Sequence, residues 1–303
     1  MPQIVANGLK FEVESLGREQ DPAVVLIMGL GMQLTSWPLE LCQPLVDHGY
    51  RVIRFDNRDI GLSEKLNGKR GQSFALAAFR HALHLHVDAP YRVETMAEDT
   101  VAIMDALGVS AAHLVGASMG GMIGQCVAAA HPERTLSLTS IMSTSGARHL
   151  PKASLRIAHH SLSRPKANAS RERIVEHYVK LFQLIGSPGF PTPEEILRER
   201  MAANLARSYH PAGTMRQLLA IVASGDRSDC LGKIRAPTLV IHGEADPLVP
   251  VAHGKDTAAK IPGASLQIVP GMGHDLAPTL VPILTEAVLG HIGSVGERRK
   301  SAA

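Results

Sequence analysis

This 303-residue sequence has few aromatic residues, and it lacks a strong charge imbalance and long hydrophobic runs. Aromatics make up 4% of the chain and its net charge is +3, so the stacking platform and the basic surface of a nucleic-acid-binding protein are not indicated. No run of about 18 apolar residues occurs, so nothing is expected to span a membrane. We therefore expect a small-molecule partner, and neither nucleic acid nor membrane; the oligomeric state is not indicated.

Cysteine is also rare. The three cysteines, Cys42, Cys126 and Cys230, form no CxxC pair, and such an odd, sparse set argues against a disulfide framework and fits a reducing compartment. The N-terminal stretch MPQIVANGLKFEVES does not place basic residues before an apolar segment, so we expect no signal peptide and a cytoplasmic protein. Hydrophobic residues make up 45% of the chain and charged residues 19%, which suits a folded protein with a large core.

Six short apolar runs have the unbroken pattern of strands buried on both faces. They lie at residues 23–28, 51–55, 112–117, 137–142, 237–242 and 265–270. Helical patterns separate them, and one at residues 95–108 has Thr95 and Glu98 in capping-box spacing and Gly108 at its end. Strands that alternate with helices predict an α/β fold with a mainly parallel sheet covered on both sides. Ahead of this pattern, Asn7-Gly8 predicts a hairpin turn.

The alternation is interrupted twice, at residues 64–94 and at residues 146–228. The second stretch contains several helical patterns parted by Pro and Gly and no strand-like run. We therefore predict a helical cap at 146–228, inserted between the two parts of the α/β core at 1–145 and 229–303. Both interruptions leave the core where strands end, so together they are expected to roof a site at that edge of the sheet.

A serine between two glycines stands where a buried strand becomes a helix, in HLVGASMGGMIGQ at residues 113–125. A tight strand-to-helix turn pushes the Ser118 hydroxyl out of the chain, and crowding at that turn requires small neighbours, here Gly116 and Gly120. The N–H of Met119 points free at the helix N-terminus, where partial positive charge favours an oxyanion. The pattern predicts a nucleophile elbow; the alternative is a serine that only caps the helix.

A serine hydroxyl is a poor nucleophile without a base, and the base should be a histidine held by a carboxylate. Asp246 follows the strand predicted at 237–242 and His274 follows the next one, so both lie at the carboxyl edge of the sheet, in the chain order serine, acid, histidine. We therefore predict a triad of Ser118, Asp246 and His274. Glu244, two residues nearer the strand, is the competing acid.

The loop after the first parallel strand, MGLGMQLTSW, should supply the second oxyanion donor. Gly29 permits a close backbone approach, and the N–H of Leu30 is the candidate donor beside that of Met119. The alternative is a glycine-rich connector without a chemical role. We expect three residues of the later loop FDNRDIGLSEK to brace the loops by hydrogen bonds: Asp56, Arg58 and Ser63.

These motifs resemble the α/β-hydrolase superfamily. The matching stretches, spread over everything except the predicted cap, are MGLG, FDNRDIGLS, GASMGG, GEADPLVP and PGMGH. Within the superfamily, FDNRDIGLSEK and DPLVPVAHGKDTAAKIPGASLQIVPGMGH are most similar to the aclacinomycin methylesterase group. The resemblance implies an α/β-hydrolase fold with Ser118 as nucleophile, Asp246 as triad acid, His274 as base, and Leu30 and Met119 as oxyanion donors.

Two departures from that group bear on the substrate. Many relatives have His-Gly where this chain has Met28-Gly29, which leaves a backbone donor unaffected, and residues 64–94 form a longer segment than in that methylesterase. The resemblance therefore implies a serine carboxylesterase of small to medium esters, with an acyl-enzyme intermediate, and does not carry over the polyketide methyl ester. The alternatives are a polyketide methylesterase, lactonase, perhydrolase, C–C hydrolase or acyltransferase, and a ligand receptor on a hydrolase scaffold.

Such a mechanism needs neither a metal nor an organic cofactor, and we expect neither. The histidine-rich stretch HALHLHVD at residues 81–88 pairs His84 and His86 only on a strand face, and no acid completes a helical ligand set. Serine at the elbow argues against haloalkane dehalogenases and epoxide hydrolases, which resemble this family but carry Asp at that position.

Overall fold

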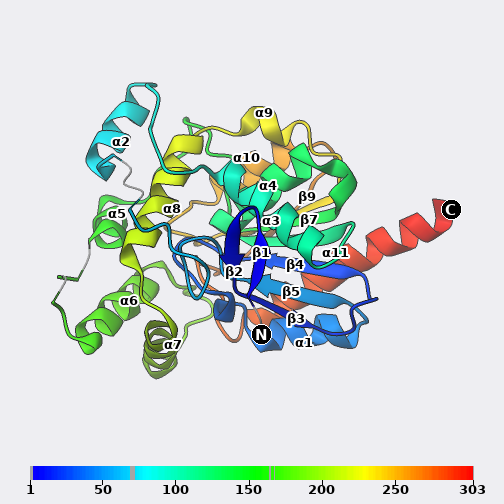
Figure 1. The fold of residues 1–303 in the computed structure, drawn as a ribbon, viewed down its shortest axis with the longest axis horizontal. Helices are drawn as coiled ribbons and strands as arrows, with labels where there is room; N and C mark the ends of the chain where they lie inside the picture. Colours follow the sequence, from blue (N-terminus) through cyan, green and yellow to red (C-terminus); the bar gives the residue numbers. More distant parts are fainter. Residues whose placement is uncertain (1–2, 69–71, 164, 167, 303) are drawn as a thin grey trace.

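The structure is a computed structural model that describes residues 3–68, 72–163, 165–166 and 168–302. Its centre is a seven-stranded sheet with the strand order β3-β5-β4-β6-β7-β8-β9 (Figure 1). β3 runs antiparallel to β5 and the other neighbours are parallel, so the predicted α/β fold with a mainly parallel sheet is confirmed. The strands are Val13–Leu16 (β3), Ala23–Ile27 (β4), Arg51–Phe55 (β5), Ala112–Ala117 (β6), Thr135–Ile141 (β7), Thr238–Gly243 (β8) and Ser265–Val269 (β9).

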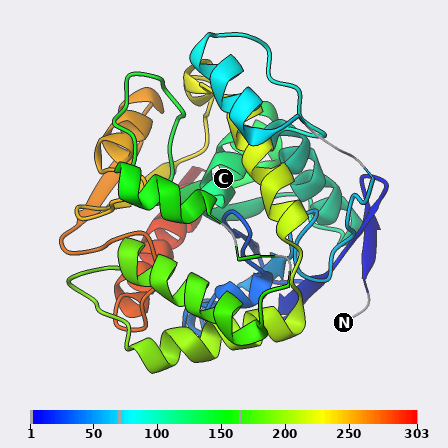
Figure 2. The ribbon, with the colours of Figure 1, turned by 90° about the vertical axis from the view of Figure 1, so that its left-hand side faces the viewer.

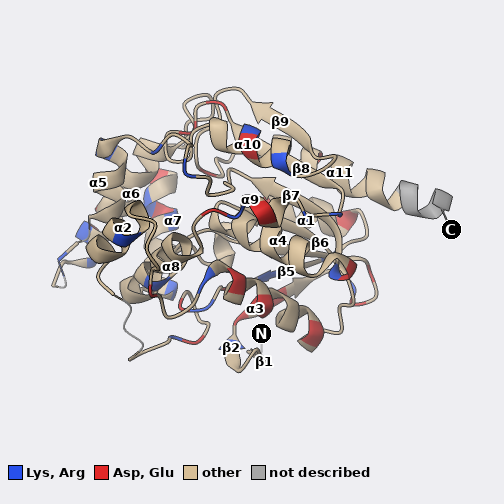
Figure 3. Ribbon diagram, turned by 90° about the horizontal axis from the view of Figure 1, so that it is seen from above, with Lys and Arg blue, Asp and Glu red and all other residues tan. Residues whose placement is uncertain are grey.

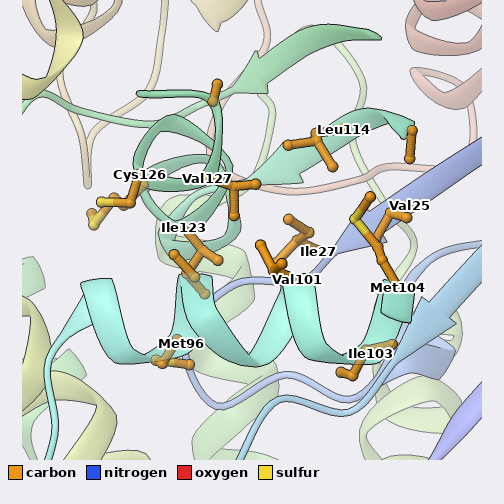
Figure 4. Packing of buried hydrophobic residues seen from close by; sticks show 14 of the residues in the cluster. Val25, Ile27, Met96, Val101, Ile103, Met104, Leu114, Ile123, Cys126 and Val127 are labelled. Carbon is orange, nitrogen blue, oxygen red and sulfur yellow. The ribbon is translucent and has the colours of Figure 1, made fainter. Parts of the chain in front are cut away.

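Helices cover both faces of this sheet. In β4, Val25 and Ile27 belong to the hydrophobic cluster of α3 and α4, whereas Val24 and Leu26 belong to the cluster of α1 and α11. Figure 4 shows side chains of α3 pointing toward Val25 and Ile27. Burial on both faces explains why this strand is an unbroken apolar run. The core helices are Leu39–Asp47 (α1), Val93–Ala106 (α3), Met119–Ala130 (α4), Ala252–Lys260 (α10) and Val281–Ala302 (α11).

Two details of the sequence-based prediction are wrong. Residues 265–270 are expected to be buried on both faces, but β9 forms the edge of the sheet beyond β8, and Leu266 is 39% exposed. The helix predicted from Thr95 starts earlier, at Val93, with Arg92 as its N-cap. Thr95 occupies the third helical position, where its hydroxyl accepts the Arg92 N–H at 3.3 Å.

The N-terminal hairpin forms as predicted, and the chain then continues into the main sheet. β1 (Ile4–Ala6) and β2 (Leu9–Phe11) pair antiparallel, with φ of 45° at Asn7 and 73° at Gly8. These positive φ values are what an Asn-Gly turn favours. The antiparallel strand β3, which follows directly, was not predicted.

Between β7 and β8 the chain is helical, as predicted for the cap. No strand occurs among the described residues of 146–228. α2 (Phe74–Ala82), from the other interruption, packs against α8, and α6 packs against α7. All of these helices except α9 lie at one side of the sheet, on the left in Figure 1 and toward the viewer in Figure 2. The inserted helices are Leu155–Leu162 (α5), Arg171–Ile185 (α6), Glu194–Arg207 (α7), Pro211–Ser224 (α8) and Ser228–Leu231 (α9); the domain boundaries stay a prediction.

Candidate active site

Ser118 stands at a strained turn between β6 and α4. Its φ of 55° and ψ of −118° lie in a region that residues with a side chain rarely adopt. The flanking glycines make the turn possible, because a Cβ on Gly120 would lie 1.9 Å from the carbonyl oxygen of Ile27, and one on Gly116 would lie 2.2 Å from that of Gly120. The helix therefore starts directly against β4, with the serine hydroxyl at the end of the sheet.

Ser118, His274 and Asp246 are joined by hydrogen bonds. The His274 ring nitrogen Nδ1 lies 2.7 Å from Asp246 Oδ2, and its Nε2 lies 3.0 Å from Ser118 Oγ. A carboxylate at Nδ1 holds the proton there, so Nε2 is free to accept the serine O–H. The three residues follow β6, β9 and β8 respectively, which brings them to one edge of the sheet. This is the geometry of a nucleophile, a base and the group that orients the base.

The carboxylate that meets the histidine is Asp246, while the side chain of the competing acid Glu244 is exposed. Asp246 Oδ1 accepts the backbone N–H groups of Leu248 and Val249 at 2.9 and 2.8 Å, which leaves Oδ2 for His274. A second histidine, His242, lies nearby, and burial lowers its pKa. Its ring donates to the Val249 carbonyl oxygen at 2.7 Å, so His242 is a neutral support for this loop.

The loop that carries His274 is held by the end of α6. The N–H of His274 donates to the carbonyl oxygen of Ile185 at 2.7 Å, and the N–H of Gly273 donates to Ser187 Oγ at 2.8 Å. Ser187 Oγ in turn donates to Asp275, whose pKa is raised by burial against the opposing effect of that hydrogen bond. The cap therefore helps to position the histidine.

The loop between β4 and α1 lies directly against Ser118. A Cβ on Gly29 would be 3.2 Å from Ser118 Cβ and 3.7 Å from its Oγ. The Gly29 carbonyl oxygen accepts the Met32 N–H at 3.2 Å, and because the peptide is planar and trans, the Leu30 N–H points the opposite way. No hydrogen bond among the described residues takes the N–H of Leu30 or of Met119.

Two buried amide side chains fix this loop from both ends. Asn57 Nδ2 donates to the carbonyl oxygen of Met28 at 2.9 Å. Gln217, from α8, accepts the N–H of Gly31 at 2.9 Å through Oε1 and donates to the Arg58 carbonyl oxygen at 3.0 Å through Nε2. Sequence reasoning missed both residues. Asn57 lies inside the FDNRDIGLS motif, but nothing in the helical pattern around Gln217 distinguishes it.

The FDNRDIGLS loop braces its surroundings, as expected. Asp56 Oδ1 accepts the N–H of Leu34 at 2.7 Å, and the Ser63 hydroxyl donates to the Asp56 carbonyl oxygen at 2.6 Å. Arg58 makes two hydrogen bonds to the buried carboxylate of Asp99. These contacts connect the loop to α3 and to the segment that follows β4.

The same loop also binds the cap through two ion pairs. Arg207 of α7 lies 2.7 Å from Asp56, and Arg216 of α8 holds both oxygens of Asp59. Burial alone would raise the pKa of Asp59, but the hydrogen bonds from Arg216, the Leu66 N–H and other donors outweigh it, and the pKa lies below its usual value. Asp59 is therefore a fully paired, buried anion.

A small hollow of about 60 Å³, open to solvent, adjoins the oxyanion-candidate loop. It is bounded on one side by Gly31 and Met32 and on the other by residues of α7, α8 and the turn between them. Ser118 and His274 are not among its lining residues. Those from the cap are Met201, Asn204, Leu205, Ser208, Tyr209, His210, Pro211 and Thr214, with Tyr178 from α6.

Histidine and acidic residues elsewhere do not assemble into a metal site: in the described ranges, no three His, Cys, Asp or Glu side chains come close enough together to hold an ion. His81 lies in the last turn of α2, and His84, with a φ of 60°, lies in the turn that follows the helix. Nor does any helix of the described chain combine the length and apolarity needed to cross a membrane.

The chain belongs to the α/β-hydrolase fold family, whose model it matches over residues 22–278. Two relatives are 30% identical to it, Rhodomycin D methylesterase DauP of Streptomyces sp. (strain C5) and Rhodomycin D methylesterase DnrP of Streptomyces peucetius. Each alignment covers 92% of this chain and 93% of the relative. The resemblance to a methylesterase group is thereby confirmed, and both names support an enzyme of the carboxylic-ester hydrolase type.

A solved structure adds the fold comparison. The meta-cleavage product hydrolase CumD from Pseudomonas fluorescens IP01 superposes with a TM-score of 0.74 over 97% of this chain and 98% of its own. Its sequence identity is 18%, so the likeness supports the shared fold and nothing about the substrate.

Proposed function

We propose that this chain is a serine carboxylic-ester hydrolase that works through an acyl-enzyme. The observation that carries the proposal is the hydrogen-bonded series of Ser118, His274 and Asp246, with the serine held at a strained strand-to-helix turn. A histidine kept in the Nδ1–H tautomer and in contact with a serine hydroxyl is what serine activation requires. The two methylesterase relatives support an ester as the substrate.

In this proposal His274 Nε2 takes the Ser118 proton while Oγ attacks the ester carbonyl carbon. Asp246 holds the tautomer and stabilises the imidazolium that forms. The N–H groups of Leu30 and Met119 hold the developing oxyanion, each worth about 3–4 kcal/mol as judged from other enzymes. His274 then protonates the leaving alcohol. It next deprotonates the water that attacks the acyl-enzyme, and the carboxylic acid leaves as Ser118 regains its proton.

Replacing the nucleophile tests the proposal directly. Ser118→Ala should lower kcat on a nitrophenyl ester by roughly 10³–10⁶-fold with the fold intact, because only oxyanion stabilisation and binding would remain. An organophosphonate should label Ser118 in the wild type, and the exposed Ser110→Ala variant should be labelled as fast. Mass spectrometry that finds the adduct on another serine would reject the assignment, and a single slow acylation without turnover would favour a receptor.

The acid can be assigned by paired amide substitutions. Asp246→Asn should lower kcat about 10⁴-fold, because an amide that donates to Nδ1 stabilises the wrong histidine tautomer. Glu244→Gln, two residues away on the same loop, should change kcat little. Steady-state kinetics of both variants check this, and the reverse result would make Glu244 the acid.

Gln217 is proposed as a positioning residue for the oxyanion loop. Gln217→Leu removes the acceptor of the Gly31 N–H and the donor to Arg58, so the loop loses its hydrogen bond to α8. We expect kcat to fall roughly 10- to 100-fold with KM little changed, because the Leu30 N–H would no longer be held in place for the oxyanion. Gln183→Leu, on the exposed side of α6, is the matched control. A fall in thermal stability with unchanged kcat at low temperature would reduce Gln217 to a structural role.

The substrate class follows from the roofed site. We propose small to medium esters, with acyl chains of roughly two to eight carbons, because ligand pockets typically measure about 300–1,000 Å³ and helices of the cap contact the loops of Gly31 and His274. kcat/KM over a series of nitrophenyl esters should pass through a maximum in that range. Emulsified triolein should be a poor substrate, and a jump in rate at its solubility limit would instead indicate a lipase.

A further inference from the structure

The net charge of the chain is only +3, but its charged residues are distributed very unevenly along the sequence. The chain contains 31 Lys and Arg and 28 Asp and Glu, yet no acidic residue occurs in residues 65–87 or 146–171. Ten of the basic residues fall in these two segments, so the rest of the chain has 21 basic against 28 acidic residues. Each segment lies within one of the two interruptions of the α/β pattern, and they contain α2 and α5. Acidic residues appear on α3 and α9 but not on α2 or α5 (Figure 3).

The same two segments expose large apolar side chains. Six of the eleven exposed large hydrophobic residues in the described chain belong to them, and the most exposed are Phe79 at 60% and Leu155 at 90%. Each helix already has another apolar face turned inward: Ala77 of α2 is packed in a cluster with Leu219 of α8, and Ile157 of α5 is buried. The outward apolar face is therefore additional to the one that holds the helix on the protein. The six residues are Leu76, Phe79, Leu83, Leu85, Leu155 and Leu162.

The two segments lie on the same side of the molecule. α2 and α5 occupy one end in Figure 1 and both face the viewer in Figure 2. Burial lowers the pKa of His81 at the end of α2, and the positive charges of Arg148 and Lys152, which precede α5, lower it further, so these charges lie near the end of α2. Arg148, Lys152 and Arg156 are exposed, and no ion pair within the described residues engages them. The surface thus combines free cations with exposed leucine and phenylalanine.

We propose that this α2–α5 surface docks on an anionic lipid membrane. A second copy of the chain is a poor occupant, because a self-complementary contact would bring cations against cations with no acid between them. Nucleic acid would pair with the cations but would leave the leucines in water. An anionic bilayer suits both kinds of side chain on this surface. Its headgroups would bind the Lys and Arg side chains, and the boundary of its acyl chains would take up the apolar ones.

The docking is peripheral. It needs no spanning helix, so the expectation of no membrane partner, which rested on the absence of such a helix, does not extend to it. It depends on anionic headgroups, so it does not require activation on a neutral triglyceride emulsion. α2 packs on α8, the helix that carries Gln217, so the membrane contact would lie on the cap and on the segment packed against it. The inference does not rest on the proposed esterase activity.

Vesicle co-sedimentation of the full chain tests it. With vesicles of phosphatidylcholine and phosphatidylglycerol at low salt, we expect the protein in the pellet, and with phosphatidylcholine alone we expect it in the supernatant. Binding should fall steeply as salt rises, because the attraction to the anionic surface is screened within a Debye length. Absence of binding to the anionic vesicles at low salt would overturn the proposal, as would equal binding to both vesicle types.

Paired variants locate the surface. Lys152→Gln with Arg156→Gln should weaken binding roughly 25-fold, since each cation near an anionic surface contributes about fivefold. Phe79→Ser with Leu155→Ser should weaken it at least tenfold, since burying one such side chain is worth about that much. The controls are Lys233→Gln with Arg235→Gln, and the 68% exposed Val5→Ser, all outside the two segments. Equal losses in the controls would contradict the assignment, and a dimer that the Phe79 and Leu155 changes dissociate would identify a second copy as occupant.

Discussion

Two buried carboxylates on one loop attach the cap to the core, and the geometry of the candidate site depends on them. Asp56 receives Arg207 from α7 and Asp59 receives Arg216 from α8. Removal of one partner of such a pair leaves an uncompensated charge that costs about 3–5 kcal/mol. Because Asn57 of the same loop donates to the carbonyl oxygen of Met28, this loop connects the cap to the loop beside Ser118.

Much of the core and of the candidate site could be predicted, because the position of a residue within its own strand or turn determines which residue types can stand there. A strand covered on both faces must be apolar throughout, and an elbow pressed against β4 excludes a side chain at Gly120, so composition at those positions follows from geometry. Asp246 and His274 could be predicted because parallel strands bring their carboxyl ends to one edge, wherever the strands lie in the sequence. The roles assigned to these residues stay predictions.

What could not be predicted depends on contacts between distant segments. Gln217 meets Gly31 across 186 residues, and the link between Ser187 and Gly273 spans 86. Neither residue type is unusual in a helix or a turn, so no pattern distinguishes them before the chain is folded. The exposure of β9 has the same origin, because an edge position is a property of the sheet and not of the strand.

The contact between α6 and the histidine loop has a consequence for the evolution and engineering of specificity in this family. Caps are natural modules for exchange, since the chain enters and leaves them at one edge of the sheet. Here, however, residues 185–189 supply hydrogen-bonding partners to Gly271, Gly273 and His274. A graft that replaced the whole cap would remove the support of a core loop, so the boundary of the exchangeable unit lies inside the helical insert rather than at its ends.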